Sequence, residues 1–156
     1  MLDFTIMDIM KQVINLARHA GDNGDVPIGA VIVRDGKIIA RGENLVQRKQ
    51  NPTLHAEIVA INRACKKLGE KFLTDCDIYV SLEPCAMCAT AISFARLRTV
   101  YFAADDAKGG GILHNAKIYD ADRHLWKPKV VQVPEYADAS VQLLRNFFVA
   151  RRNNKE

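Results

Sequence analysis

The sequence predicts an α/β fold in which helices cover both faces of a central, mixed five-stranded sheet. The first observation is a hairpin signal: apolar runs at 28–34 and 37–42 flank Asp35-Gly36, a pair that favours a two-residue turn between antiparallel strands. The second is that the later strands alternate with helical segments along the chain. An antiparallel pair followed by such alternation is typical of a three-layer α/β/α arrangement.

The individual elements follow from hydrophobic periodicity and from breaker residues. At 4–20, apolar side chains recur at helical spacing, which predicts an amphipathic helix. The next helix ends at Leu68-Gly69, because glycine commonly follows the last turn. The expected helices are 4–20, 55–67, 84–95 and 137–152; the expected strands are 28–34, 37–42, 77–82, 99–103 and 129–133; the expected loops are 21–25, 43–53 and 104–128, the last with a turn of helix.

Length and composition limit the classes of protein that need to be considered. At 156 residues, the chain is expected to form a single domain over 1–156 with a proper hydrophobic core. It has no uninterrupted apolar run long enough to span a membrane, and its first residues lack the pattern of a signal peptide. The four cysteines fit a reducing compartment better than a disulfide framework. We therefore expect a cytoplasmic protein without a membrane partner.

The net charge of +4 is unevenly distributed along the chain. Residues 1–122 carry 15 basic and 15 acidic side chains, whereas 123–156 carry seven basic and three acidic ones. A basic C-terminal segment is typical of a phosphate-binding face. It is equally typical of a solubilising helix end, because cations near the C-terminus of a helix are favoured by its dipole. Charge alone leaves both interpretations open.

Two short motifs contain good zinc ligands: His55-Ala56-Glu57 and Pro84-Cys85-Ala86-Met87-Cys88. Cys85 and Cys88 are three residues apart, which places them on one face of a helix. Pro84 suits the first helical position, where its missing N–H is not needed. Both thiols are then expected in the first turn, where the helix dipole favours the thiolate form.

His55 and Glu57 are two residues apart, and in the middle of a helix they would point in opposite directions. Both can face one ion if they occupy the first turn of their helix, with Thr53 as its N-cap. We therefore expect two helix N-termini that converge on a single metal ion.

A three-ligand site of this kind has a clear chemical use. Zinc held by three protein ligands keeps its fourth position for water, as catalytic zinc sites do. Glu57 is not needed as a ligand, so it can serve as the acid/base for that water. His-x-Glu followed by Pro-Cys-x-x-Cys is the pattern of zinc-dependent deaminases. The expected reaction is hydrolytic deamination, which replaces a ring amino group by oxygen and releases ammonia.

Other interpretations of the Cys-x-x-Cys pair remain open from the residues alone. The pair could be a redox centre or two buried thiols. A structural zinc site would need a fourth ligand, for which Cys76, His114 and His124 are the candidates. Cys65 and Cys76 are more typical of small core residues, because free cysteines are often buried.

Several segments beyond the metal motifs carry a family resemblance. The chain is identified as a member of the cytidine deaminase superfamily, and within it the chain resembles the bacterial tRNA adenosine deaminases. The superfamily implies a cytidine-deaminase-like fold. The resemblance covers most of the chain, and the segments that carry it are 26–31, 42–44, 52–57, 81–88, 104–108, Phe147-Phe148 and Arg151-Arg152.

The resemblance implies a homodimeric, cytoplasmic enzyme that converts adenosine to inosine at the wobble position of a tRNA anticodon. Its partner would be the anticodon stem-loop, and no DNA is expected. It implies one Zn²⁺ per subunit, held by His55, Cys85 and Cys88, with Glu57 as the catalytic proton shuttle. Substrate contacts are implied for Asn44, Ala56, Asp106, Lys108, Arg151 and Arg152. A single-stranded loop suits such a site, because its bases splay out cheaply.

The chain also departs from the family pattern at 111–114 and 123–128, where many relatives carry Gly-Ser-Leu and Asn-His-Arg. Asn44 could simply turn its loop, and Asp106 could fix the turn before the glycines at 109–111. The alternative functions are deamination of a free base or nucleoside (guanine, cytosine or cytidine) and RNA binding around zinc without catalysis. An open, basic groove would favour the RNA substrate, whereas a pocket closed by the C-terminal segment would favour a free base.

Overall fold

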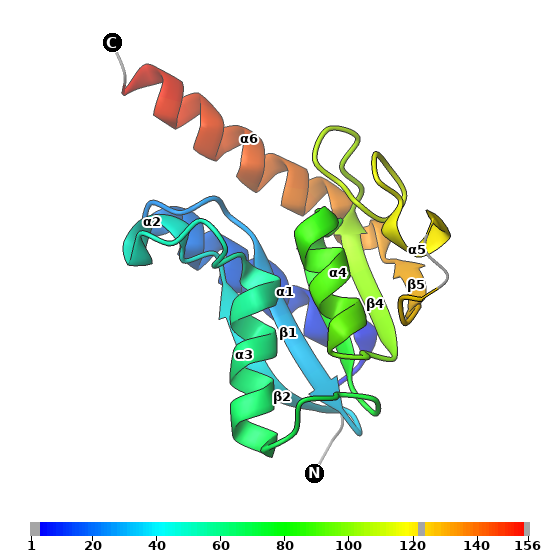
Figure 1. Cartoon of the computed structure of the whole chain (residues 1–156). Coiled ribbons are helices and arrows are strands. Elements are labelled where there is room, and N and C mark those ends of the chain that lie inside the picture. Colours follow the sequence, from blue (N-terminus) through cyan, green and yellow to red (C-terminus); the bar gives the residue numbers. More distant parts are fainter. Residues whose placement is uncertain (1–3, 122–123, 155–156) are drawn as a thin grey trace.

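A mixed five-stranded sheet forms the centre of the computed structural model, which describes residues 4–121 and 124–154 (Figure 1). Its strand order is β2-β1-β3-β4-β5. β1 is antiparallel to β2 and to β3, whereas β3, β4 and β5 run parallel. The strands are β1 (Gly29–Arg34), β2 (Lys37–Glu43), β3 (Asp77–Leu82), β4 (Thr99–Ala104) and β5 (Lys129–Gln132). The predicted number, order along the chain and mixed character of the strands are confirmed.

Helices cover both faces of the sheet, which gives the predicted three layers (Figure 1). α3 and α4 pack on one face, and α1 and α6 lie on the other. The helices are α1 (Ile6–Asp22), α2 (Val46–Lys49), α3 (Ala56–Leu68), α4 (Ala86–Phe94), α5 (Ile118–Ala121) and α6 (Ala137–Asn153), with a 3-10 turn η1 (Pro134–Tyr136). Within the described part of the chain, every helix is too short or too polar to cross a membrane.

Strand alternation divides the core into two halves. Along β1, Ala30 and Ile32 pack toward α3 and α4, whereas Val31 and Val33 pack toward α1. All four side chains are buried, as expected for a strand that is covered on both faces. Burial on both faces explains why 28–34 reads as a continuous apolar run instead of an alternating one.

The hairpin between β1 and β2 forms as predicted. Asp35 and Gly36 have φ values of 52° and 72°, and Arg34 pairs with Lys37 across the turn. Two consecutive residues with positive φ define the type I′ turn, whose twist matches that of the strands. The hairpin therefore places the end of β2, and the loop after it, beside the start of β1.

The structure corrects three details of the expected elements. α1 begins two residues later than predicted, because Thr5 caps it: the Thr5 hydroxyl accepts from the Asp8 N–H, and the Asp8 carboxylate accepts from the Thr5 N–H, each at 3.1 Å. α2 lies inside the expected polar loop, and its single turn is too short to show apolar periodicity. η1 was also not predicted, since three residues give no pattern.

Candidate active site

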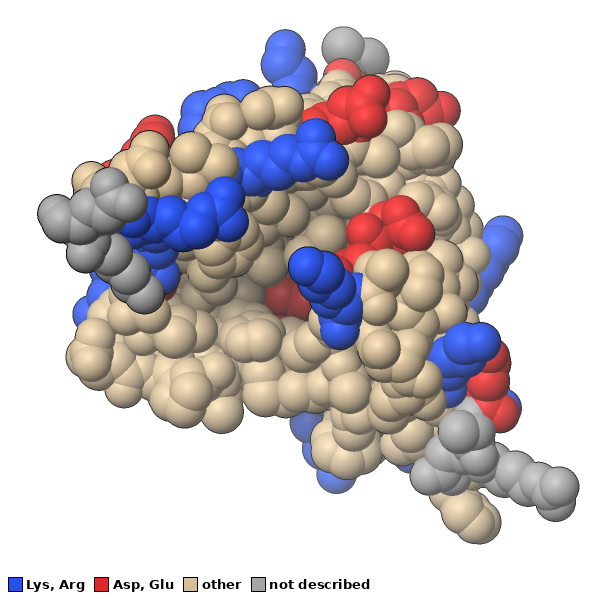
Figure 2. Space-filling model, turned by 90° about the horizontal axis from the view of Figure 1, so that it is seen from above, with Lys and Arg blue, Asp and Glu red and all other residues tan. Residues whose placement is uncertain are grey.

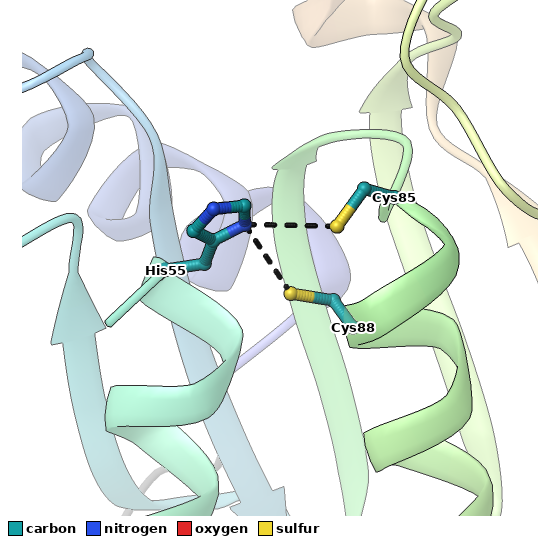
Figure 3. A group of neighbouring side chains, drawn as sticks. All are labelled: His55, Cys85 and Cys88. Carbon is teal, nitrogen blue, oxygen red and sulfur yellow. Dashed lines mark hydrogen bonds between the residues drawn. The ribbon is translucent and has the colours of Figure 1, made fainter. Parts of the chain in front are cut away.

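The N-termini of α3 and α4 bring three metal-ligating side chains together (Figure 3). The Nδ1 atom of His55 lies 3.6 Å from the Sγ atom of Cys85 and 3.6 Å from that of Cys88. These ligand atoms all lie within 4.8 Å of one another, and no other His, Cys, Asp or Glu in the described ranges joins the group. The expected convergence of two helix ends is present, and a fourth protein ligand from the described residues is not.

The helix boundaries at this site differ from those predicted. His55 and Cys85 are themselves the N-cap residues, with extended backbone at ψ 157° and 173°. Thr53 is not the N-cap, because its hydroxyl donates to the Asn51 side chain at 2.7 Å instead. Pro84 likewise precedes the cap and lies outside the helix. Because His55 lies before the first turn, it and Glu57 can both face the site.

The two thiols are coupled to each other. The pKa of the Cys85 thiol is lowered to about 4, mainly because the Cys88 thiol hydrogen-bonds to it, with His55 adding to the effect. The same hydrogen bond, together with burial, raises the pKa of Cys88. The pair therefore favours one thiolate and one thiol. A dication placed among them would displace the remaining thiol proton, since metal binding deprotonates thiol ligands.

Glu57 is a buried carboxyl group beside the ligand group, with 4% of its surface exposed. Burial is the largest cause that raises its pKa to about 7, and the nearby Cys85 adds to the shift. A carboxyl group with a pKa close to neutral can both take and give a proton at physiological pH. An acid/base beside a metal-bound water needs this property.

A groove of about 740 Å³ runs between α6 and the ends of the central strands. Its apolar lining includes Ile28, Leu82 and Phe148, and Leu82 is three residues before Cys85. The charged lining consists of Asp105, Asp106, Lys108, Arg145 and Arg152. Figure 2 shows a hollow on this side of the molecule, with Lys and Arg side chains around its rim and acidic groups within it.

The comparisons with known proteins agree with this architecture. The MafB19-like deaminase family matches residues 4–152. The chain belongs to this family. It is 43% identical over 136 residues to the tRNA-specific adenosine deaminase of Agrobacterium fabrum, a match that covers 87% of this chain and 89% of the relative. The expected resemblance to bacterial tRNA adenosine deaminases is thereby confirmed.

Solved structures resemble the deaminase to different degrees. One, from studies of A-to-I editing by tRNA:A34 deaminases at the wobble position of transfer RNA, is 40% identical with a TM-score of 0.85, and covers 88% of this chain and 99% of its own. The guanine deaminase of Bacillus subtilis is 36% identical with a TM-score of 0.65, and covers 92% of this chain and 95% of its own. The first comparison confirms the expected cytidine-deaminase-like fold.

Asn44 and Ala56, two of the predicted substrate-binding residues of this deaminase, offer different atoms. Asn44 is buried, and its side-chain oxygen accepts from the Val46 N–H at 3.0 Å, so it does turn its loop. Its Nδ2 atom has no hydrogen-bond partner among the described residues, which leaves its donors for a ligand. The Ala56 side chain is fully buried, so a substrate contact would have to come from its backbone N–H at the start of α3.

The remaining predicted residues lie on the groove side. Asp106 accepts from the N–H groups of Lys108 and Gly109 at 3.1 and 3.0 Å, so it fixes a turn while it also lines the groove. Arg152 lines the groove, whereas Arg151 is exposed and its guanidinium lies 5.0 Å from the centre of the Phe147 ring. The structure therefore brings Asp106, Lys108 and Arg152 together, with Arg151 beside them.

Sequence reasoning missed two residues of this deaminase's site. Arg145 lines the groove one and two helical turns before Phe148 and Arg152, and this helical spacing could have revealed it. Glu83 is buried directly before Pro84, and it binds the segment that follows β4. Its position in the sequence, directly after an apolar strand and before the Pro84-Cys85 motif, could have indicated that it is buried. A buried carboxylate needs hydrogen-bond partners, which would have marked it as an anchor for another segment.

The Glu83 carboxylate is stabilised in its charged form. Burial acts to raise its pKa, but hydrogen bonds from His114 and from backbone N–H groups of Asp106, Leu113 and Ile112 outweigh it and hold the pKa below its ordinary value. Of the two other cysteines, Cys76 is buried in the core as predicted, whereas Cys65 is only partly buried against it.

Proposed function

We propose that this chain is a single-domain zinc hydrolase that deaminates the wobble adenosine of a tRNA anticodon to inosine. The observation that carries the chemistry is the convergence of His55, Cys85 and Cys88 on one point beside the buried Glu57. The observation that favours RNA is the open groove with Lys108, Arg145 and Arg152 along it. The similarity to tRNA-specific adenosine deaminases supports the same substrate.

One Zn²⁺ per subunit fits the ligand group. Two thiol sulfurs and one imidazole nitrogen within 4.8 Å of one another form a donor set that suits zinc, and three protein ligands leave a position for water. Zinc bound there would act as a Lewis acid and lower the pKa of a water molecule toward 7. His55, Cys85 and Cys88 would hold it, with His55 as the neutral imidazole and both cysteines as thiolates.

Glu57 moves the protons of the reaction. It takes a proton from the attacking water, whose oxygen bonds to the ring carbon that bears the amino group, and donates that proton to the neighbouring ring nitrogen. It then takes the proton of the newly added hydroxyl group and gives it to the amino group, which leaves as ammonia while the C–O bond becomes a carbonyl. Its buried position beside the metal-ligating side chains suits a group that takes and gives protons there. Burial also keeps bulk water from exchanging with the transferred proton, since only 4% of the residue is exposed.

The groove and its rim supply the contacts to RNA. Asn44 would hydrogen-bond the purine edge through its Nδ2 atom, and the N–H at Ala56 would face the reacting base. Asp106 and Lys108 would contact the nucleotides on either side of the flipped adenosine. Phosphates attract cations, so Arg151 and Arg152 would meet the anticodon backbone.

The assembly and cellular setting are part of the same proposal. We infer that the chain works as a homodimer in the cytoplasm, where its tRNA substrate is found. DNA is not expected as a substrate. These inferences rest on the family resemblance, and size-exclusion chromatography with light scattering would measure the oligomeric state directly.

Deamination of a free base is the second candidate. It is supported by the similarity to the Bacillus subtilis guanine deaminase, which is 50% identical over 99 residues that make up 62% of each chain. A free-base enzyme needs no cationic groove, however, and benefits from a closed pocket. Here α6 borders the groove on one side, and the hollow stays open to solvent on the face shown in Figure 2. RNA binding without catalysis is disfavoured by the buried Glu57 beside the three metal-ligating side chains, because a merely structural zinc site has no use for that carboxyl group.

Product analysis by mass spectrometry tests the proposal. Purified protein is given an anticodon stem-loop with adenosine at the wobble position, and in parallel free adenine, adenosine, guanine, cytosine and cytidine. We expect inosine at that one RNA position and no change in the free compounds. Turnover of guanine with intact RNA would instead establish the second candidate while leaving the zinc and Glu57 chemistry in place.

A further inference from the structure

Glu83 is the anchor of the segment that follows β4. Its side chain is fully buried and accepts five hydrogen bonds from residues that the structure describes. Four come from backbone N–H groups, at 3.1 Å for Asp106, 3.2 Å for Ile112, 3.0 Å for Leu113 and 3.3 Å for His114. The segment 106–114 is therefore wrapped around one carboxylate, which fixes the path of the backbone itself.

The same segment is pressed against the helix that carries the thiol ligands. The Gly111 N–H donates to the Pro84 carbonyl at 2.8 Å. A side chain at Gly111 would collide with the backbone of Cys85 and Ala86, and one at Gly110 would collide with the Glu83 carboxylate. Close backbone packing of this kind requires glycine at both positions. The segment cannot shift without disturbing these contacts at the N-terminus of α4.

His114 supplies the fifth hydrogen bond from its ring. Its Nδ1 atom lies 2.9 Å from the Glu83 carboxylate, and because a carboxylate only accepts, Nδ1 carries the hydrogen. Its Nε2 atom lies 3.8 Å from the carboxylate of Asp105, a groove residue. The imidazole thus bridges the buried anchor and the groove wall. His114 stands in the stretch where this chain departs from the common family pattern.

We propose that Glu83 and His114 are positioning residues, which set the place of Asp106 and Lys108 relative to the metal-binding Cys85. The inference rests on the proposed function, since Asp106 and Lys108 are there assigned to the nucleotides that flank the target adenosine. It assigns neither Glu83 nor His114 a contact with the substrate. Both residues act on the reaction through the segment 106–114. Their substitution should therefore weaken RNA binding more than it slows the chemical step.

Substitution of His114 tests this because the side chain is about one-third exposed, which makes folding of the variants expected. His114→Ala removes the ring donor, and His114→Asn restores it, because Asn Nδ2 lies the same number of bonds from Cβ as His Nδ1. Leu113→Ala is the matched control: Leu113 is 44% exposed, and its N–H to Glu83 is kept. KM and kcat are measured on the anticodon stem-loop with zinc-loaded protein.

We expect His114→Ala to raise KM about tenfold with kcat within about twofold, because loop contacts bind the ground state and the transition state alike. His114→Asn should restore most of the loss, and Leu113→Ala should leave KM unchanged. In a Lys108→Ala background, His114→Ala should raise KM by less than tenfold, because part of its effect passes through the contact of Lys108 with the RNA, which is already lost. A loss in kcat alone, an unchanged KM, or full additivity would overturn the proposal.

Amide hydrogen exchange separates this inference from the proposed function. Glu83→Gln places an NH₂ group where N–H donors converge, so exchange at 106–114 should accelerate, and His114→Ala should show a smaller acceleration in the same segment. If the wild-type protein fails to deaminate RNA, the proposed function fails, but this exchange pattern still reports on the anchor. Unchanged exchange at 106–114 in both variants would overturn the positioning role whatever the substrate is.

Discussion

The Arg48 guanidinium anchors the loop over 43–54, whereas the Glu83 carboxylate anchors the segment 106–114. In the first, Arg48 donates to Asp25 at 2.7 Å, to Glu43 at 2.8 Å and to the Asn44 carbonyl at 2.9 Å. In the second, Glu83 accepts mainly from backbone N–H groups. The first loop carries Asn44, and the second segment carries Asp106 and Lys108.

The difference in burial between Arg48 and Glu83 determines how much each contributes to the stability of its loop. The Arg48 side chain is 28% exposed, so water can replace a lost partner, whereas the Glu83 side chain is 0% exposed. Arg48 binds two side chains and one backbone carbonyl, whereas Glu83 binds four backbone N–H groups and so fixes the backbone path. The buried Glu83 carboxylate therefore holds its loop more rigidly than Arg48 does. If Glu83 is removed, the N–H groups that it bound are left without an acceptor in a site that water does not reach, which costs free energy.

Removal of the anchor should have the largest effect on stability. In Glu83→Ala, backbone N–H groups that are now paired lose their acceptor in a buried site, and we expect a loss of about 4 kcal/mol in the free energy of unfolding. Urea denaturation of zinc-loaded protein measures it. A loss below about 1 kcal/mol would mean that water reaches the site and that the contrast between the loops is wrong.

The difference in stability between wild type and Glu83→Ala should also depend on pH, in a direction that the pKa of Glu83 determines. The pKa of Glu83 is lowered from 4.5 in the folded protein, so its carboxylate stabilises the fold fully above pH 4.5, and that contribution is lost as the pH falls through the folded pKa. The stability difference between wild type and Glu83→Ala should therefore be constant near neutral pH and shrink below pH 4.5. A difference that grows on acidification would contradict the assignment.

The cation-centred loop should be more tolerant. In Asp25→Ala, Arg48 keeps Glu43 and the Asn44 carbonyl, while the Gln47 N–H loses its partner at 2.6 Å. We expect a loss of about 2 kcal/mol, measured by urea denaturation. Asp22→Ala, an exposed residue at the end of α1, is the control and should change stability by less than about 0.5 kcal/mol. A larger loss than that of Glu83→Ala would reverse the comparison.

The outermost link of the same network should matter least. His19 lies 2.8 Å from the Glu43 carboxylate, but its side chain is 62% exposed. Exposed ion pairs are weak, so His19→Ala should lower stability by less than about 0.5 kcal/mol. The shift in thermal midpoint would measure it, and a shift equivalent to more than about 1 kcal/mol would show that the network extends further than its burial suggests.

These two loops also show where sequence reasoning succeeds and where it ends. The ligand group could be predicted because His55 with Glu57, and Cys85 with Cys88, are local pairs whose spacing fixes their direction at a helix end. Glu83 meets partners that are 23 to 31 residues away, and Arg48 meets Asp25 across 23 residues. No periodicity encodes such pairs, since they depend on how loops fold back on the sheet.

The errors at the site itself have a similar cause. Thr53 has the chemistry of an N-cap and Pro84 that of a first helical residue, and local propensity favours both. In the structure, the two helices begin one residue after His55 and Cys85, which places these two ligands before the first turn, while Cys88 stays within the first turn of α4. Tertiary convergence therefore outweighs local capping preference at this point.

The most direct test of the whole account compares wild type with Glu57→Gln on the wobble-adenosine stem-loop, with zinc content measured on the same samples. We expect one zinc per chain in both proteins, and a kcat for Glu57→Gln that is lower by about a factor of 10²–10⁴ or more, because general acid–base transfer is lost while the ligands remain. A Glu57→Gln protein that keeps its zinc and deaminates the RNA within about twofold of the wild-type rate would contradict the proposed chemistry.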